Sequence, residues 1–278
     1  MADLDGDGWD DDEWEDDGEW EDVGDPDDPD VAGTRVFEYS ATVAPGEDGM
    51  AELLRTGEVE VLGRMPWSSN GTYLVEVRAG DDHAPGIYKP LAGERPLWDF
   101  PGGLWRREVA ASVLSDALGW GLVPPTVART DGPFGEGSLQ AFVPARYEEH
   151  FFTLRDDPAH GEVLRRLCAF DLVANSADRK GGHCLLDGDG RVWAIDNGLT
   201  FHEEFKVRTV IWDFAGEAVP DRLRADLDEF IGRALPEELG TLLSRAEREA
   251  LVTRAGGLVA GGRFPHDPSG RRYPWPLV

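Results

Sequence analysis

The stretch ANSADRKGGHCLL, residues 174–186, places an acid, two bases, two glycines and a histidine directly before a short apolar run. A second stretch, VWAIDNGLTF at 192–201, begins like a strand and breaks at Asp-Asn-Gly. The residues before both, GEVLRRLCAFDLVAN, have the apolar spacing of a helix. This pattern predicts a helix, then a loop that carries Asp178, then a hairpin that delivers Asp196 at a strand end.

The polar residues of these stretches match what phosphoryl transfer from ATP requires. The reaction needs a carboxylate to orient the acceptor hydroxyl, a cation near the γ-phosphate and two ligands for a divalent ion. Asp178 and Lys180 would be the catalytic carboxylate and cation, and His183 and Asp196 would hold Mg²⁺ or Mn²⁺. The spacing equals that of the kinase pattern Asp-x-x-x-x-Asn, although histidine stands here in place of asparagine.

The other parts of a kinase occur upstream in the required order. IYKP predicts Lys89 on a short strand, and WRREVAASVL predicts Glu108 on the following helix. Asn70-Gly71 is a hairpin signal where a phosphate-covering turn belongs, and SLQAFVP would offer backbone groups to the adenine edge. The expected ATP-binding residues are Ser68, Ser69, Asn70, Gly71, Lys89, Glu108, Gln140, Ala141, Phe142 and Val143.

The order of segments predicts an α+β, bilobal protein-kinase-like fold. Residues 34–143 are expected to form the β-rich N-lobe, with one helix, and residues 144–278 the mainly helical C-lobe. Residues 1–33 contain seventeen acids and no Lys or Arg. Such a segment cannot bury enough apolar area to offset its chain entropy, so we expect a disordered acidic tail.

Each motif also has a plainer interpretation when it is taken alone. Asp196-Asn-Gly is typical of a turn, Lys89 of an exposed strand lysine and His183 of a structural histidine. Asp187-Gly-Asp-Gly resembles the start of a calcium loop but lacks the later glutamate, so we interpret it as a hairpin turn. The joint order and spacing of the parts favour a kinase over these separate interpretations.

Composition limits the other function classes. The net charge of −28 disfavours nucleic acid as a partner, because phosphate binding needs clustered positive charge. No run of eighteen apolar residues is present, and the acidic start is the reverse of a signal peptide, so we expect a cytoplasmic protein without integral membrane association. Cys168 and Cys184 lack CxxC spacing and are expected to be inert core thiols.

The motifs resemble those of the phosphatidylinositol 3-/4-kinase superfamily, most of all type II phosphatidylinositol 4-kinases. The likeness covers residues 60–201 and lies in SSNGTYLV, IYKP, REVAASVL, LVPPTV, SLQAFV, NSADRKGGHCLL and AIDNGLTF. It implies that Lys89 is the phosphate lysine, Asp178 the catalytic aspartate, Asp196 the metal-binding aspartate and Gln140–Val143 the nucleotide hinge. The chain departs from the family at His183, where asparagine is usual, and in LAGERPLWDFPGGLW, which lacks the cysteine-rich acylated insertion.

The sequence therefore predicts an ATP-dependent phosphotransferase that acts on a hydroxyl acceptor, either a protein or a phosphoinositide-type lipid. The lipid follows from the resemblance alone, and the acidic charge opposes binding to an anionic membrane. The alternative is a nucleotide-binding, pseudokinase-like regulatory module without significant turnover, an interpretation motivated by His183. The acceptor, the oligomeric state and a partner for the acidic tail stay open.

Overall fold

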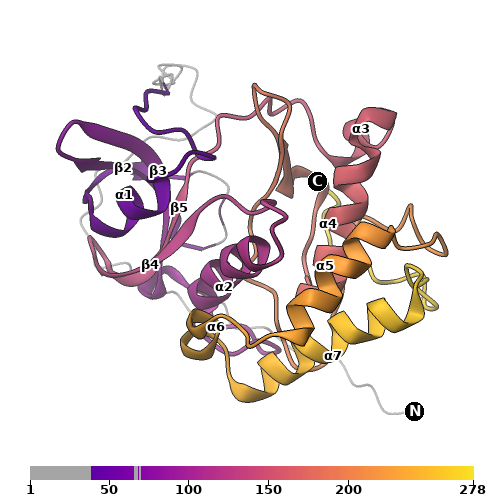
Figure 1. The fold of residues 1–278 in the computed structure, drawn as a ribbon. Helices are drawn as coiled ribbons and strands as arrows, with labels where there is room; N and C mark the ends of the chain where they lie inside the picture. Colours follow the sequence, from indigo (N-terminus) through magenta and orange to yellow (C-terminus); the bar gives the residue numbers. More distant parts are fainter. Residues whose placement is uncertain (1–38, 66–67, 69) are drawn as a thin grey trace, which may run out of the picture. The chain divides into compact units, whose positions relative to one another are not determined.

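The computed structural model describes residues 39–65, 68 and 70–278 (Figure 1). The predicted acidic tail, residues 1–33, and the predicted ATP-binding residue Ser69 lie outside the described residues. In the described part of the chain, no helix is both long enough and apolar enough to span a bilayer.

A five-stranded antiparallel sheet dominates the first half of the described chain. Its order is β1-β2-β3-β5-β4, formed by β1 (Glu58–Arg64), β2 (Tyr73–Ala79), β3 (Asp82–Pro90), β4 (Thr126–Gly132) and β5 (Gly135–Ala141). Alternating apolar residues such as Val75 and Val77 are buried with Leu54 of α1 (Met50–Thr56), so this short helix and the sheet share one core. β1 and β2 pair as antiparallel neighbours, and Asn70-Gly71, the predicted hairpin signal, lies shortly before β2.

The second half is mainly helical. It contains α3 (Phe151–Leu154), α4 (Gly161–Ala174), α5 (Asp221–Gly232), α6 (Glu237–Leu242) and α7 (Arg245–Gly261), with one hairpin of β6 (Cys184–Leu186) and β7 (Val192–Ala194). Short 3-10 turns lie at η1 (Leu91–Gly93), η2 (Pro158–His160) and η3 (Gly181–His183). Asp187 closes the β6–β7 turn by accepting from two backbone N–H groups, which is the plain turn that the sequence predicts.

Helix α2 (Leu104–Ala117) links the two halves (Figure 1). It follows β3 in the chain and packs on β4 and β5, while its Ala110, Ala111 and Leu114 belong to the core of the helical half. The predicted α+β class is thus confirmed, with a β-rich part followed by a mainly helical part.

Candidate active site

The loop that carries Asp178 begins where α4 ends. Asn175 ends the helix in the left-handed conformation, with φ at 60°, which asparagine tolerates better than most residues. Its side-chain amide donates to the carbonyls of His202 and Glu204 and accepts from the N–H of Lys206. One buried side chain therefore ties the Asp178 loop to the segment after the Asp-Asn-Gly motif.

Arg179 holds this loop from inside the protein. Its side chain is fully buried, and Nε donates to Asp171 Oδ1 on α4 at 3.0 Å. The terminal nitrogens donate to the carbonyl of Ile195 and to Asn197 Oδ1, both at 2.6 Å. Arg179 thus joins α4, the Asp178 loop and the strand end in one network. Sequence reasoning missed this role, because the partners of Arg179 are brought to it by tertiary packing and no local pattern marks them.

Lys89 lies at the centre of the charged site. Its Nζ is 2.5 Å from Glu108 Oε1 on α2 and 2.8 Å from Asp196 Oδ1 after β7. Burial works to lower the pKa of Lys89, but Asp196 and Glu108 outweigh it and raise the pKa above its ordinary range. Lys89 in turn holds the pKa of Asp196 below its ordinary range. Both groups are therefore charged at neutral pH, and one lysine connects three elements far apart in the chain.

The Asp196-Asn197-Gly198 segment turns sharply so that Asp196 faces Lys89. Asp196 has a φ of 55°, a left-handed conformation that non-glycine residues adopt only where surrounding contacts maintain it. The Asn197 N–H donates to Glu108 Oε2 at 2.9 Å, which supplies such a contact. A Cβ on Gly198 would lie 3.3 Å from Glu108 Oε1, so this position favours glycine.

His183 and Asp178 approach the same carboxylate from the loop. His183 Nε2 lies 3.3 Å from Asp196 Oδ2, and its Nδ1 accepts from the N–H of Lys180 at 3.4 Å. Burial lowers the pKa of His183 to about 4, so the ring is neutral at pH 7, and the bond to Nδ1 favours the proton on Nε2. Burial raises the pKa of Asp178, whose Oδ2 lies 3.3 Å from Lys180 Nζ.

The predicted phosphate-covering turn contains one hydrogen bond of its own and is bound to the segment after β3 by two more. Ser68 Oγ lies 2.8 Å from the hydroxyl of Thr72, the Asn70 side chain accepts from the N–H of Arg95 at 3.0 Å, and the Gly71 N–H donates to the carbonyl of Gly93 at 2.8 Å. Gly71 and Gly93 touch closely, because a Cβ on either would come within 2.9 Å of the other's backbone. The turn is therefore held against η1, directly after the Lys89 strand.

The predicted hinge residues already have partners within the protein. Gln140 uses its side-chain amide to donate to Thr126 at 2.8 Å. The Ala141 N–H donates to the carbonyl of Pro125 at 2.9 Å, and the Phe142 N–H to that of Pro85 at 3.1 Å. Val143 is buried against Leu185 and Trp193.

The donor set fits a divalent ion bound together with phosphate. Among the described residues, no group of three or more His, Cys, Asp or Glu side chains could hold a metal. Asp178 and Asp196 are partly exposed, with side-chain exposures of 27% and 49%. Mg²⁺ in phosphate-binding proteins commonly takes only one or two carboxylates, and phosphate oxygens and water complete its shell. Asp196 could supply such a carboxylate, whereas His183 would first have to move its proton to Nδ1.

Comparison with known proteins identifies a relative. No family model matches the chain. Protein Rv2133c of Mycobacterium tuberculosis (strain ATCC 25618 / H37Rv) is 40% identical over 261 residues, covering 81% of this chain and 94% of the relative. The chain belongs to the Rv2133c family.

Two solved structures are also similar to this member of the Rv2133c family. The structure of hydra Fam20 with sugar has a TM-score of 0.48 at 14% identity, covering 76% of this chain and 86% of that one. The Helicobacter pylori proinflammatory kinase CtkA has a TM-score of 0.43 at 12% identity, covering 76% and 94%. The resemblance to phosphatidylinositol kinases stays a prediction.

Proposed function

We propose that this protein is an ATP-dependent phosphotransferase that transfers the γ-phosphate to a hydroxyl group. The ion cluster around Lys89 carries the proposal, because Lys89 Nζ lies within 2.8 Å of carboxylates from both Glu108 and Asp196. In kinases the strand lysine must pair with a helical glutamate, and a separate aspartate must hold the metal near the same phosphates. One cluster supplies all three groups here.

Each charged residue has a distinct role in this proposal. Lys89, held by Glu108, binds the α- and β-phosphates, and Asp196 is the carboxylate for Mg²⁺ or Mn²⁺. The bound metal would neutralise the charge that develops on the phosphates. Asp178 accepts a hydrogen bond from the acceptor hydroxyl, and the burial that raises its pKa makes it a better proton acceptor. Lys180, 3.3 Å from Asp178, steadies the phosphoryl group as it moves.

Adenine would lie against the segment that follows β5. The backbone N–H groups of Ala141 and Phe142 donate to the carbonyls of Pro125 and Pro85. In this proposal the backbone donor to the adenine edge is therefore the N–H of Val143. The acceptor hydroxyl belongs to a protein or to a phosphoinositide-type lipid, and the cytoplasmic location stays part of the prediction.

A regulatory module that binds nucleotide without turnover is the second candidate. His183 supports it, since its Nε2 proton points to Asp196 and its Nδ1 already accepts a hydrogen bond. A histidine that stabilises Asp196 in this way leaves the metal with one ligand fewer than a typical kinase supplies.

Transfer of label from γ-labelled ATP separates the two candidates. The full chain is incubated with Mg²⁺ or Mn²⁺ and a cell lysate, which is then split into lipid and protein fractions. We expect label in one fraction, loss of that label with Asp178→Ala, and a nucleotide-induced thermal shift that survives this substitution. A thermal shift with no transfer to lipid, protein or the chain itself would favour the module. Absence of any nucleotide-induced shift would contradict both.

A further inference from the structure

The pairing of Lys89 with Glu108 depends on where α2 is held. Lys89 lies on β3 of the sheet, whereas Ala111 and Leu114 of α2 pack in the core of the helical half. In kinases this lysine–glutamate pair is commonly the switch, because movement of the helix makes or breaks it. Contacts that fix α2 therefore decide whether such a switch exists here.

Arg107, the neighbour of Glu108, makes a buried ion pair with α7. Its Nη2 donates to Glu247 Oε1, and the two side chains are only 5% and 12% exposed. Consecutive helical residues point about 100° apart, so α2 presents Glu108 toward Lys89 and Arg107 toward α7. The charge on Arg107 has no aqueous alternative in this environment, and loss of Glu247 would leave it buried and unpaired.

Glu247 is itself held rigidly by the start of α7. Its Oε2 accepts from the Ser244 N–H at 2.8 Å, and the Ser244 hydroxyl accepts from the Glu247 N–H at 3.2 Å. This reciprocal capping box leaves Oε1 free for Arg107. The partner of Arg107 is thus a fixed point of the helical half rather than a mobile surface acid.

The two ends of α2 are held as well. At its start, the Glu94 carboxylate accepts from the N–H groups of Gly103 and Trp105, both at 2.8 Å. At its end, Arg233 donates to the carbonyl of Ala117. Glu94 lies just beyond the Lys89 strand, so α2 is tied both to the sheet and to the helical half.

We infer that the Arg107–Glu247 pair is a positioning pair that holds Glu108 against Lys89, so that the lysine–glutamate pair is assembled without an activating signal. The inference rests on the proposed function only for its effect on turnover. The geometric consequence concerns the unliganded protein: Lys89 stays paired with Glu108 for as long as Arg107 stays paired with Glu247.

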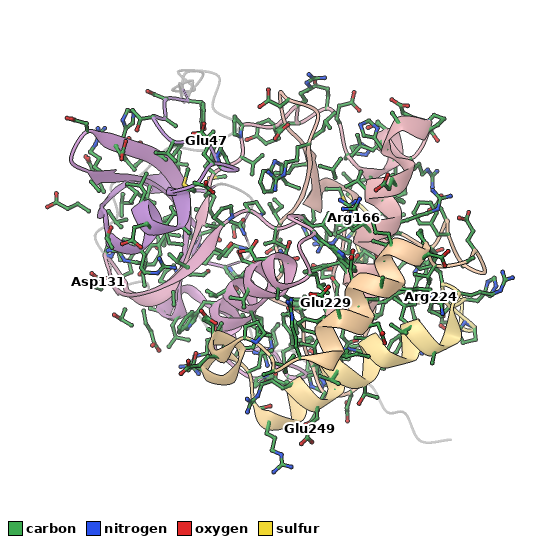
Figure 2. All side chains as sticks on the ribbon, in the orientation of Figure 1. Glu47, Asp131, Arg166, Arg224, Glu229 and Glu249 are labelled. Atoms are coloured by element: carbon green, nitrogen blue, oxygen red, sulfur yellow. The ribbon has the colours of Figure 1, made fainter. Side chains whose placement is uncertain are left out.

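The three lysines of the chain make this pairing measurable. Protein labelled with ¹⁵N-lysine has side-chain ammonium signals from Lys89, Lys180 and Lys206 alone, and Lys89→Arg identifies the first. Glu108→Gln gives the reference signal for Lys89 without its helical partner. Arg107→Met and Glu247→Gln are the test variants. Glu249→Gln is the matched control, because it makes the same change two residues along α7 (Glu249 is labelled in Figure 2). The Glu249 side chain is 63% exposed and forms an ion pair with Arg245.

We expect both test variants to shift the Lys89 signal to the Glu108→Gln position, and the control to keep the wild-type signal. If phosphate is transferred, kcat/KM for ATP should fall roughly tenfold in the test variants, the size expected for loss of one charge-assisted hydrogen bond. An unchanged Lys89 signal in folded Arg107→Met and Glu247→Gln proteins would overturn the inference. Arg107→Lys keeps the buried charge with three N–H donors in place of five, and it provides the test if the other variants do not fold. It adds one lysine signal of its own, so the Lys89 signal is again identified with Lys89→Arg. The Lys89 signal should move part of the way, and a signal identical to wild type would also overturn the inference. Because the signal needs no turnover, an inactive wild-type protein would contradict the proposed function and leave this test intact.

Discussion

Arg179 and Lys180 are neighbours in the chain with the same charge, yet they occupy opposite environments. The Arg179 side chain is fully buried and donates to Asp171, Ile195 and Asn197. The Lys180 side chain is 23% exposed and forms an ion pair with Asp178, itself 27% exposed. We call Arg179 and its buried partners the frame, because they hold the loop in place. We call Asp178 and Lys180 the exposed set, because these partly exposed charges can exchange partners with a ligand. Substitutions in the two sets should therefore affect different measurements.

The exposed set should show the largest effect, and only on turnover. Asp178→Asn keeps the shape of the side chain but removes the carboxylate that would orient the acceptor hydroxyl, so we expect phosphate transfer to fall about 10²–10⁴-fold. The midpoint of urea unfolding should stay within the error of wild type, because Asp178 is partly exposed. Asp189→Asn, an exposed acid in the β6–β7 turn, serves as the control and should change neither quantity. Equal transfer rates in Asp178→Asn and wild type would remove Asp178 from the catalytic role.

The buried frame should respond in the opposite way, with a loss of stability. Arg179→Met leaves Asp171 buried without its ionic partner, which should lower the free energy of unfolding by about 3–5 kcal/mol. Turnover should be lost as well, because Arg179 holds both the Asp178 loop and the Asp196 turn in position. Arg166→Met on α4 (Arg166 is labelled in Figure 2) removes an ion pair with Glu162, whose side chain is 74% exposed, and should cost less than about 1 kcal/mol in urea unfolding. Similar losses of unfolding free energy in Arg179→Met and Arg166→Met would contradict the stabilising role that we assign to the buried Arg179 network.

The boundary between frame and exposed charges can be probed at Gly198. An alanine Cβ would lie 3.3 Å from the Glu108 oxygen that binds Lys89, so the carboxylate would have to yield. We expect Gly198→Ala to cost about 1–3 kcal/mol of stability and to raise KM for ATP. Gly188→Ala is the matched control, because a Cβ there meets no atom within 4 Å. A Gly198→Ala protein with wild-type stability and KM would mean that Glu108 can move without consequence.

Local sequence patterns predicted the charged cluster around Lys89 better than the frame. Lys89 on a strand, Glu108 on a helix and Asp196 at a strand end can each be recognised within about ten residues, since helix and strand periods are local. The structure brings these three together, although their roles in catalysis stay predictions.

Local sequence patterns did not predict the frame, because tertiary packing determines which residues it brings together. Nothing near Arg179 marks Asn197, eighteen positions away, as its partner, and Glu247 lies 140 positions from Arg107. Asn175 is the exception: an asparagine directly after an apolar-periodic segment is a recognised helix end, and that signal could have found it.

The smallest effect is expected at the predicted phosphate-covering turn, where Ser68 could belong either to the phosphate-binding residues or to the frame. The Ser68 hydroxyl lies 2.8 Å from that of Thr72, within the turn that should cover the phosphates. Loss of one neutral hydrogen bond is worth about 1 kcal/mol, so Ser68→Ala should raise KM for ATP by about threefold to tenfold if the hydroxyl binds phosphate, with kcat unchanged. If Ser68 belongs to the frame instead, the same substitution should lower the unfolding free energy and leave KM alone. Steady-state kinetics and urea unfolding on one preparation distinguish these results, and Ser40→Ala, an exposed serine bonded to His83, gives the background for hydroxyl removal. We expect the change in KM, because a turn held by Gly71 and Asn70 through other bonds does not need the Ser68 hydroxyl to keep its shape.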